Sequence, residues 1–256
     1  MLYLINAADG CAWARQHRAV AIVVDTLRAS STVAILLERA REVIVVRTVE
    51  DAQALAARCP GALLVGERQG LPPAGFDLGN SPVAARSCDC TGRSVIFTST
   101  TGAARATAVM EEEVPSLFLG APVNAQAVAQ AAWATARRQA CDIVLIPAGH
   151  VEDDQGTGPE DAAGATVIGL ALQSLGVPLA PGTVWAFDPT PPEQIPQRAA
   201  AAIRTSPHAR FLATLGPEFQ ADVDFCCRLN VTPSVPRCVG TVPLASGERG
   251  MVFTAA

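Results

Sequence analysis

Acidic and basic side chains follow the first apolar segment of the sequence. Asp25 and Arg28 come directly after the apolar residues 19–24. The carboxylate suits a metal ligand, or less readily a nucleophile. The guanidinium suits a phosphate because it donates two parallel hydrogen bonds. Ser30 and Ser31 follow, and we expect them to begin a helix whose free backbone amides favour an anion. The structural alternatives are a helix cap for Asp25 and a surface ion pair for Arg28.

A second group of polar residues occupies the seventeen-residue segment GERQGLPPAGFDLGNSP at 66–82. A connection of this length is usually functional or mobile. Two acids and an amide supply the hard oxygen ligands that magnesium prefers, and glycines let backbone amides approach a ligand closely. The alternative is a turn-rich surface loop. The side chains that we single out here are Glu67, Arg68, Asp77, Asn80 and Ser81.

Hydroxyl residues form a third group. Thr100, Thr101 and Gly102 follow the apolar segment 94–98 and lead into a helical pattern. Hydroxyls and the amides of a helix N-terminus can hold a phosphate, although helix capping alone would explain the same residues. The segment lacks the lysine of a Walker sequence, and G-x-S-x-G does not occur in the chain.

A fourth group lies further along the chain. Glu160 and Asp161 begin a helix rich in small residues, where the helix dipole favours acids in any case. His150 is a candidate acid or base. We interpret His17 and His208 as structural, since a lone histidine more often has that role.

Alternating strands and helices must position these residues. Short apolar runs suit strands buried on both faces, and they occur at 19–24, 42–47, 62–65, 94–98, 116–119 and 142–146. Helical patterns lie between them at 31–39, 52–58, 103–112 and 124–138. This alternation predicts an α/β fold with a mainly parallel sheet covered by helices on both faces. Ligands of such sheets bind beyond the carboxyl ends of the strands, where the polar groups lie.

The pattern changes after residue 149. A small-residue helix at 160–175 precedes a proline-rich connector at 178–196. Helical segments follow at 197–204 and 207–229, and late apolar runs lie at 237–242 and 251–254. We expect residues 1–150 to form the α/β core. Residues 151–256 either complete that core or form a C-terminal extension, as a small second α/β lobe.

Composition narrows the function classes. The formal net charge is −5, which disfavours nucleic-acid binding. No lysine occurs among the nineteen cationic residues, which excludes Schiff-base chemistry and a P-loop lysine. The uncharged segment 162–187 is broken by Pro178 and Pro181, so we expect no membrane helix. The eight cysteines form no CxxC pair and we read no signal peptide, so we expect free thiols and a cytoplasmic protein. The apolar composition suggests a homodimer.

Five segments resemble the 2-phosphosulfolactate phosphatase (ComB) family. They are VVDTLRASST (23–32), GERQGLPPAGFDLGNSP (66–82), FTSTTGAARA (97–106), GPEDAAGA (158–165) and SPHARFLATLGPEFQADVDFC (206–226). The resemblance implies an α/β fold with its site in a cleft. It also implies hydrolysis of 2-phospho-3-sulfolactate to 3-sulfolactate and phosphate, with magnesium, in coenzyme M biosynthesis. The positions on family motifs are Asp25, Arg28, Glu67, Arg68, Asp77, Asn80, Thr100, Gly102, Glu160 and Asp161.

This resemblance leads to a hypothesis of mechanism. Mg²⁺ held by Asp25 and Glu67, with help from Asp161 or Asp77, would polarise the phosphoryl group and orient a water for in-line attack. We prefer this to an aspartyl-phosphate, because the D-x-D pattern is absent at Asp25, where Leu27 takes the second position.

Other residues are expected to bind the substrate. Arg28, Arg68 and the amides near Gly102 would balance the charge of the phosphoryl oxygens. The donors expected for the sulfonate and the carboxylate are Arg105, Asn80 or Ser81.

The chain departs from the family at Thr101 and Ala103, where the family usually reads T-N-G-T. Two alternatives therefore stay open. One is a phosphatase of another sugar or hydroxy-acid phosphate, and the other is a phosphate-ligand binding protein without turnover.

Overall fold

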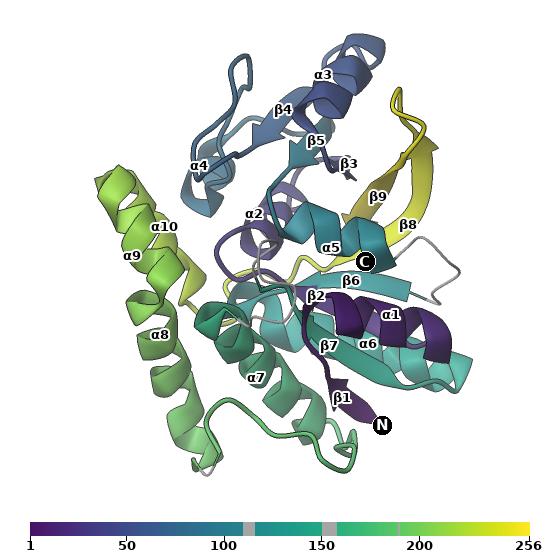
Figure 1. The fold of residues 1–256 in the computed structure, drawn as a ribbon, viewed down its shortest axis with the longest axis vertical. Helices are drawn as coiled ribbons and strands as arrows, with labels where there is room; N and C mark the ends of the chain where they lie inside the picture. Colours follow the sequence, from purple (N-terminus) through teal and green to yellow (C-terminus); the bar gives the residue numbers. More distant parts are fainter. Residues whose placement is uncertain (110–115, 150–157, 189) are drawn as a thin grey trace.

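The computed structural model describes residues 1–109, 116–149, 158–188 and 190–256 (Figure 1). Its sheet has nine strands in the order β1-β7-β2-β6-β8-β9-β3-β5-β4. The strands are β1 (Leu2–Leu4), β2 (Val20–Val24), β3 (Glu42–Val46), β4 (Leu63–Gly66), β5 (Ser94–Thr98), β6 (Ser116–Gly120), β7 (Ile143–Pro147), β8 (Pro236–Pro243) and β9 (Arg249–Ala255). All six strands predicted in the first 150 residues are present.

Helices alternate with these strands. They are α1 (Ala7–His17), α2 (Ala29–Leu36), α3 (Val49–Arg58), α4 (Pro82–Ser87), α5 (Gly102–Val109), α6 (Ala125–Gln139), α7 (Pro159–Ser174), α8 (Ile195–Thr205), α9 (Pro207–Leu215) and α10 (Pro217–Cys226). Short 3₁₀ turns occupy η1 (Pro122–Asn124) and η2 (Pro192–Gln194). The sequence patterns did not predict β1, α1 or α4. The predicted helix 103–112 extends into residues 110–112, which lie outside the described part of the chain.

The sheet consists of two parallel groups of strands with an antiparallel hairpin between them. Strand β2 pairs in parallel with β6 and β7, and β3 pairs in parallel with β5. Strands β8 and β9 form the hairpin, which pairs antiparallel with β6 on one side and β3 on the other. The mainly parallel α/β fold is therefore confirmed. The late strands lie in the middle of the sheet, which their place in the sequence did not indicate.

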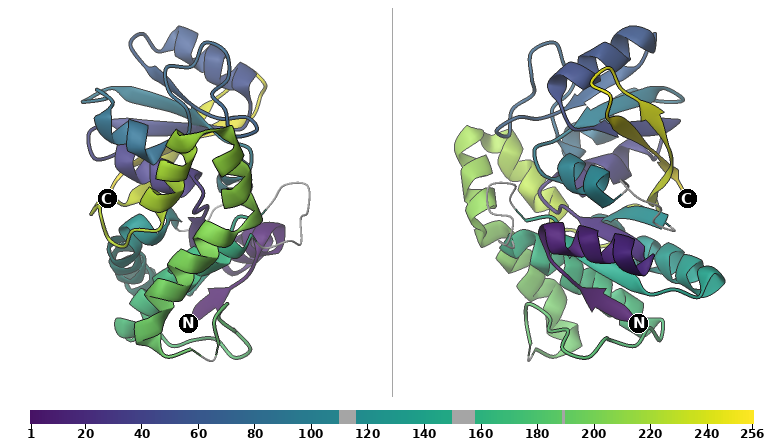
Figure 2. Two further views of the ribbon diagram at one scale, coloured as in Figure 1. Left: turned by 90° about the vertical axis from the view of Figure 1, so that its left-hand side faces the viewer. Right: turned by 45° about the vertical axis from the view of Figure 1, so that its right-hand side comes forward.

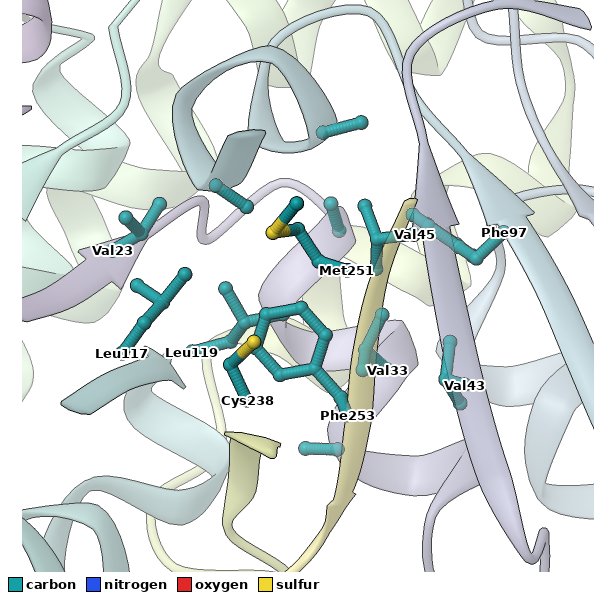
Figure 3. Packing of buried hydrophobic residues seen from close by; sticks show 14 of the residues in the cluster. Val23, Val33, Val43, Val45, Phe97, Leu117, Leu119, Cys238, Met251 and Phe253 are labelled. Carbon is teal, nitrogen blue, oxygen red and sulfur yellow. The ribbon is translucent and has the colours of Figure 1, made fainter. Parts of the chain in front are cut away.

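Both faces of the sheet are buried, as the apolar strands require. In β2, Ala21 and Val23 pack with residues of α1, α2 and α5, whereas Val20, Ile22 and Val24 pack with α6 and α7. Figure 3 shows the first of these clusters, to which β3, β5, β6 and the hairpin all contribute. Each buried valine or isoleucine adds about 1.5–3 kcal/mol to stability. This packing holds the carboxyl ends of the strands in place.

Helices α8, α9 and α10 lie along one flank of the molecule (left in Figure 1, towards the viewer in the left panel of Figure 2). Helix α8 contacts α7, and α10 contacts α4. The single helical segment predicted over 207–229 is wrong, because the chain breaks at Gly216, which has φ = 151°. Pro217 then begins α10, and a proline at the first helical position needs no hydrogen-bond partner for its nitrogen.

Two further expectations concern the start of helix α2 and the absence of a membrane-spanning helix. Helix α2 begins at Ala29 with Arg28 at its N-cap, so Ser30 and Ser31, expected to begin this helix, lie inside its first turn. In the described ranges, no helix is long and apolar enough to cross a bilayer.

Candidate active site

A pocket of about 650 Å³ lies where loops after β2, β4 and β5 meet helix α9. Most of its polar residues come from the groups that the sequence singled out, and α9 contributes His208, Phe211 and Leu215. The lining residues are Asp25, Leu27, Arg28, Glu67, Arg68, Gln69, Gly70, Leu71, Asn80, Thr100, Thr101, His208, Phe211 and Leu215. Segments up to 190 residues apart in the chain thus face one space.

Asp25 is buried at the end of β2. Its carboxylate accepts a hydrogen bond from the Ala29 amide at 3.1 Å, which fixes the side chain over the turn into α2. The pKa of Asp25 is raised from 3.8 to about 6, mainly by burial and also by the charges of Glu67 and Glu160, against the lowering effect of amide hydrogen bonds from Ala29 and Gly102. Asp25 therefore lies in a region of concentrated negative charge.

Glu67 is buried after β4 and joins two loops. Its Oε1 accepts a hydrogen bond from the Thr100 amide at 2.8 Å, and its Oε2 accepts one from the Gly70 amide at 2.9 Å. Loops after two neighbouring strands are thus held by one carboxylate. This arrangement fixes Glu67 in the pocket beside the hydroxyl segment.

Glu160 and Asp161 lie in the first turn of α7 and are both buried. Asp161 accepts the Thr26 amide at 2.8 Å and the Gly149 amide at 3.0 Å. It therefore ties α7 to the loops after β2 and β7. Burial raises the pKa of Asp161 well above its usual range, and the charges of Asp25 and Glu160 add to the shift.

The Oε2 atom of Glu160 is buried without a hydrogen-bond partner among the described residues. A buried carboxylate oxygen is costly to leave unpaired. Asn80 lines the pocket, and its Oδ1 is also buried with no partner in the part of the chain that the structure describes. These two oxygens are unused acceptors.

Arg28 supplies positive charge to the pocket. Its Nη1 donates to Asp222 at 2.7 Å, and its Nη2 donates to the Gly70 carbonyl at 2.8 Å. Its guanidinium also lies over the ring of Phe219, 5.1 Å from the centroid. Arg28 is therefore a buried, fixed cation beside a cluster of carboxylates.

Comparison with known proteins identifies the family of this chain. The family model described as 2-phosphosulpholactate phosphatase matches residues 11–241. The chain belongs to the 2-phosphosulpholactate phosphatase family. The expectation of a phosphoric monoester hydrolase is thereby confirmed at the level of the family.

Relatives match over most of their length. A protein of Deinococcus radiodurans is 37% identical over 86% of this chain and 88% of its own. One of Carboxydothermus hydrogenoformans is 35% identical over 84% of both chains. One of Thermotoga petrophila is 32% identical over 87% of this chain and 90% of its own. All three are named probable 2-phosphosulfolactate phosphatase. The resemblance stated from the motifs is therefore confirmed.

Not every residue that the phosphatase motifs indicated reaches the pocket. Ser30 and Ser31 are buried, and their hydroxyls donate to the carbonyls of Val23 and Thr26. Asp77 is exposed, and its Oδ2 accepts the Leu64 amide at 2.8 Å. These three side chains are absent from the pocket lining and hold local structure.

Three further residues that the sequence indicated use their side chains in hydrogen bonds within the protein. Ser81 caps α4 and also donates to Asp222 at 2.6 Å. Arg105 is buried in α5, where its Nε donates to the Ala148 carbonyl at 3.0 Å. Arg68 lines the pocket, but its guanidinium donates to the Glu67 carbonyl at 2.6 Å and to Thr98 Oγ1 at 2.9 Å.

The sequence patterns did not indicate that the last helices contribute to this pocket. His208, Phe211 and Leu215 of α9 line it, although His208 was interpreted as structural. Asp222 of α10 pairs with Arg28. The signal that could have located them is the family segment 206–226, which carries the motif but shows no strand end. His150, the candidate acid or base, lies outside the described residues.

The family resemblance implies magnesium, so the carboxylates near the pocket should suit a divalent cation. Across the part of the chain that the structure describes, no three His, Cys, Asp or Glu side chains form a ready-made metal group. Nevertheless, like charge gathers here, because the charges of Glu67 and Glu160 add to the raised pKa of Asp25, and those of Asp25 and Glu160 add to the raised pKa of Asp161. The unpartnered Glu160 oxygen is a free hard ligand. Buried negative charge with an unused oxygen fits a divalent cation.

Proposed function

We propose that this chain is a magnesium-dependent phosphatase that hydrolyses 2-phospho-3-sulfolactate to 3-sulfolactate and phosphate. The family membership and the names of the relatives support the substrate class. The single structural observation that carries the proposal is one pocket lined by Asp25, Glu67 and Arg28. Carboxylates and a guanidinium around one space are the elements that phosphoryl transfer uses.

In this proposal Arg28 binds the phosphoryl group. Two of its N–H groups are used by Asp222 and Gly70, and the remaining donors can meet phosphoryl oxygens. Because the guanidinium is already held in place, it stabilises charge in the transition state without reorganising. Thr100 and Thr101 line the same pocket and add hydroxyl donors.

The rest of the substrate carries a carboxylate and a sulfonate. Asn80 lines the pocket and can donate from its amide nitrogen. Arg68 adds positive charge to the lining beside Glu67. We assign these two residues to the anionic groups that do not react, because both lie on the loop after β4.

We assign Asp25, Glu67 and Glu160 as the carboxylates that would hold Mg²⁺. Asp161, a metal ligand in our sequence hypothesis, accepts the Thr26 amide next to Asp25 and the Gly149 amide, so its carboxylate also fixes the loop that carries Asp25. When bound, the ion would act as a Lewis acid on the phosphoryl group.

Phosphate release tests this proposal. Purified protein is incubated with 2-phospho-3-sulfolactate, with Mg²⁺ or with EDTA. We expect release of one phosphate per substrate molecule with Mg²⁺ and almost none with EDTA. No release under either condition would reject phosphatase activity on this substrate, whereas equal release under both would reject the metal requirement.

A second candidate is a phosphatase of another sugar or hydroxy-acid phosphate. It is favoured by Thr101, which lines the pocket at a position where the family usually has asparagine. A panel of phosphorylated metabolites with Mg²⁺ separates the two. If kcat/KM is lowest for 2-phospho-3-sulfolactate within the panel, the second candidate is the better one.

A further inference from the structure

The Arg28 guanidinium is held between two segments that are far apart in the sequence. Its Nη1 donates to Asp222 Oδ2 on α10 at 2.7 Å. Its Nη2 donates to the Gly70 carbonyl, in the loop after β4, at 2.8 Å. Both side chains of the ion pair are only 2% exposed. A buried pair of this kind holds its geometry firmly, because removing either partner leaves an uncompensated charge.

Asp222 also fixes the far end of the loop after β4. Its Oδ1 accepts the Ser81 hydroxyl at 2.6 Å and the Val83 amide at 3.4 Å, at the beginning of α4. One carboxylate therefore binds the guanidinium through one oxygen and the start of α4 through the other. The two oxygens of Asp222 are both engaged, so its own position is determined.

The contacts continue from Arg28 to Glu67 through a single residue. Gly70 accepts Arg28 at its carbonyl and donates its amide to Glu67 Oε2 at 2.9 Å. Phe219, one turn before Asp222 on α10, places its ring 5.1 Å from the Arg28 guanidinium carbon. Helix α10 thus controls the position of the cation, and through it the loop that carries Glu67.

The surroundings of Arg28 make this control necessary. Asp25 and Glu67 line the same pocket and attract a guanidinium. With no opposite charge behind it, Arg28 would pair with these carboxylates and would not face a phosphoryl group. Asp222, which is not part of the pocket lining, supplies that opposite charge from α10.

We propose that Asp222 is the positioning residue for Arg28: it directs the guanidinium toward the phosphoryl group of the substrate and keeps it off the pocket carboxylates. The inference rests on the proposed function, because it assigns Arg28 to an anionic phosphorus group. Asp222 itself touches no substrate. A merely structural ion pair, which joins α10 to the loop, would affect stability without changing affinity for phosphate.

The test compares Asp222→Asn with Asp224→Asn. Both aspartates lie on α10 and pair with an arginine, Asp222 with Arg28 at 2.7 Å and Asp224 with Arg204 at 2.8 Å. The second pair is about half exposed and outside the pocket lining, which makes it a matched control. Inorganic phosphate is the probe, and its Kd is measured by calorimetry alongside the melting temperature of each variant.

We expect Asp222→Asn to weaken phosphate binding about tenfold and to lower kcat/KM about 10- to 100-fold, the range that a misplaced catalytic group produces. Asp224→Asn should change neither quantity by more than about twofold. A folded Asp222→Asn variant with the wild-type phosphate Kd would overturn the inference.

A second variant serves if Asp222→Asn does not fold. Phe219→Leu leaves the ion pair in place and removes the ring beside the guanidinium, so we expect a phosphate Kd about threefold weaker. An unchanged Kd in that variant contradicts control by α10. Failure of the proposed function looks different: wild-type protein would bind phosphate but release none from 2-phospho-3-sulfolactate. If the wild-type protein binds no phosphate at all, the inference about Asp222 is overturned, because Arg28 then has no phosphate to bind.

Discussion

Gly102 lies directly against Asp25. A Cβ placed on Gly102 would come within 2.6 Å of Asp25 Oδ2 and 2.8 Å of the Ala29 Cβ. The start of α5 therefore packs against the carboxylate at the end of β2 with no room for a side chain. This contact explains why a glycine follows the hydroxyl segment, and it relates the loop after β5 to the most perturbed carboxylate of the pocket.

Gly102→Ala should displace Asp25 and reduce phosphatase activity. Overpacking of this kind costs about 1–3 kcal/mol in stability, and we expect kcat/KM to fall by more than about tenfold because the carboxylate moves. Steady-state kinetics and urea unfolding measure the two effects. Gly240→Ala is the control, since a Cβ at Gly240 meets nothing within 4 Å. Full activity in Gly102→Ala would show that the Asp25 position tolerates this shift.

Asp25→Asn should abolish magnesium-dependent phosphate release while the fold stays intact. The amide has the same shape and can still accept the Ala29 hydrogen bond, but it loses the charge that a divalent ion requires. Circular dichroism checks the fold, and phosphate release at saturating Mg²⁺ checks the activity. A variant that keeps most of its activity removes Asp25 from the proposed ligands.

Stability without metal should depend on pH through Asp25. Its pKa is about 6 in the native state against 3.8 in the reference state, so between about pH 4 and pH 6 the native state binds more protons than the unfolded state. The free energy of unfolding therefore falls as pH rises through this window, by on the order of 3 kcal/mol from this group. The raised pKa of Asp161 acts in the same direction.

The Asp25 contribution is measured as a difference. Urea unfolding in EDTA at pH 4.5, 5.5, 6.5 and 7.5 is compared between wild type and Asp25→Asn. We expect the variant to gain stability relative to wild type as pH rises to about 6 and to keep that gain above it. Added Mg²⁺ should reverse the difference at pH 7.5, because the ion binds only the ionised native site. A constant difference across this range would contradict the raised pKa.

Glu160→Gln should weaken magnesium binding. The change removes one buried negative charge next to Asp25 and Asp161, together with the unpartnered oxygen. We expect the Mg²⁺ concentration for half-maximal activity to rise by about 10-fold or more, and stability in EDTA to increase. Glu38→Gln is the control, since Glu38 is exposed. An unchanged Mg²⁺ requirement would exclude Glu160 from the ligand set.

The central strands could be predicted because a strand that is buried on both faces consists largely of consecutive apolar residues. Residues 20–24 are all apolar, and three consecutive apolar residues form the centre of 94–98; short runs of this kind are typical of central strands. Strand β1 has only three residues, which is too short for such a pattern, and it forms by pairing with β7, 141 residues away in the chain. The break between α9 and α10 does have a local signal in the sequence, the dipeptide Gly216-Pro217.

Within the loop after β4, the sequence indicated five side chains, of which Glu67, Arg68 and Asn80 line the pocket and Asp77 and Ser81 do not. Asp77 and Asn80 are three residues apart, yet Asp77 is exposed and Asn80 is buried in the pocket lining. A turn-rich loop has no periodicity, so composition cannot tell which side chains point inward. Only the packing of the loop against the rest of the chain decides this.

The sequence by itself determined the two-sided apolar strands and the acids, arginine and hydroxyls that follow them, because both are properties of adjacent residues. The tertiary structure alone decided that Asp222 pairs with Arg28 and that Glu160 Oε2 has no hydrogen-bond partner among the described residues. Both depend on how helices α7 and α10 pack against distant loops. Ion pairs and desolvation act through space, and a distance through space is not encoded by separation along the chain.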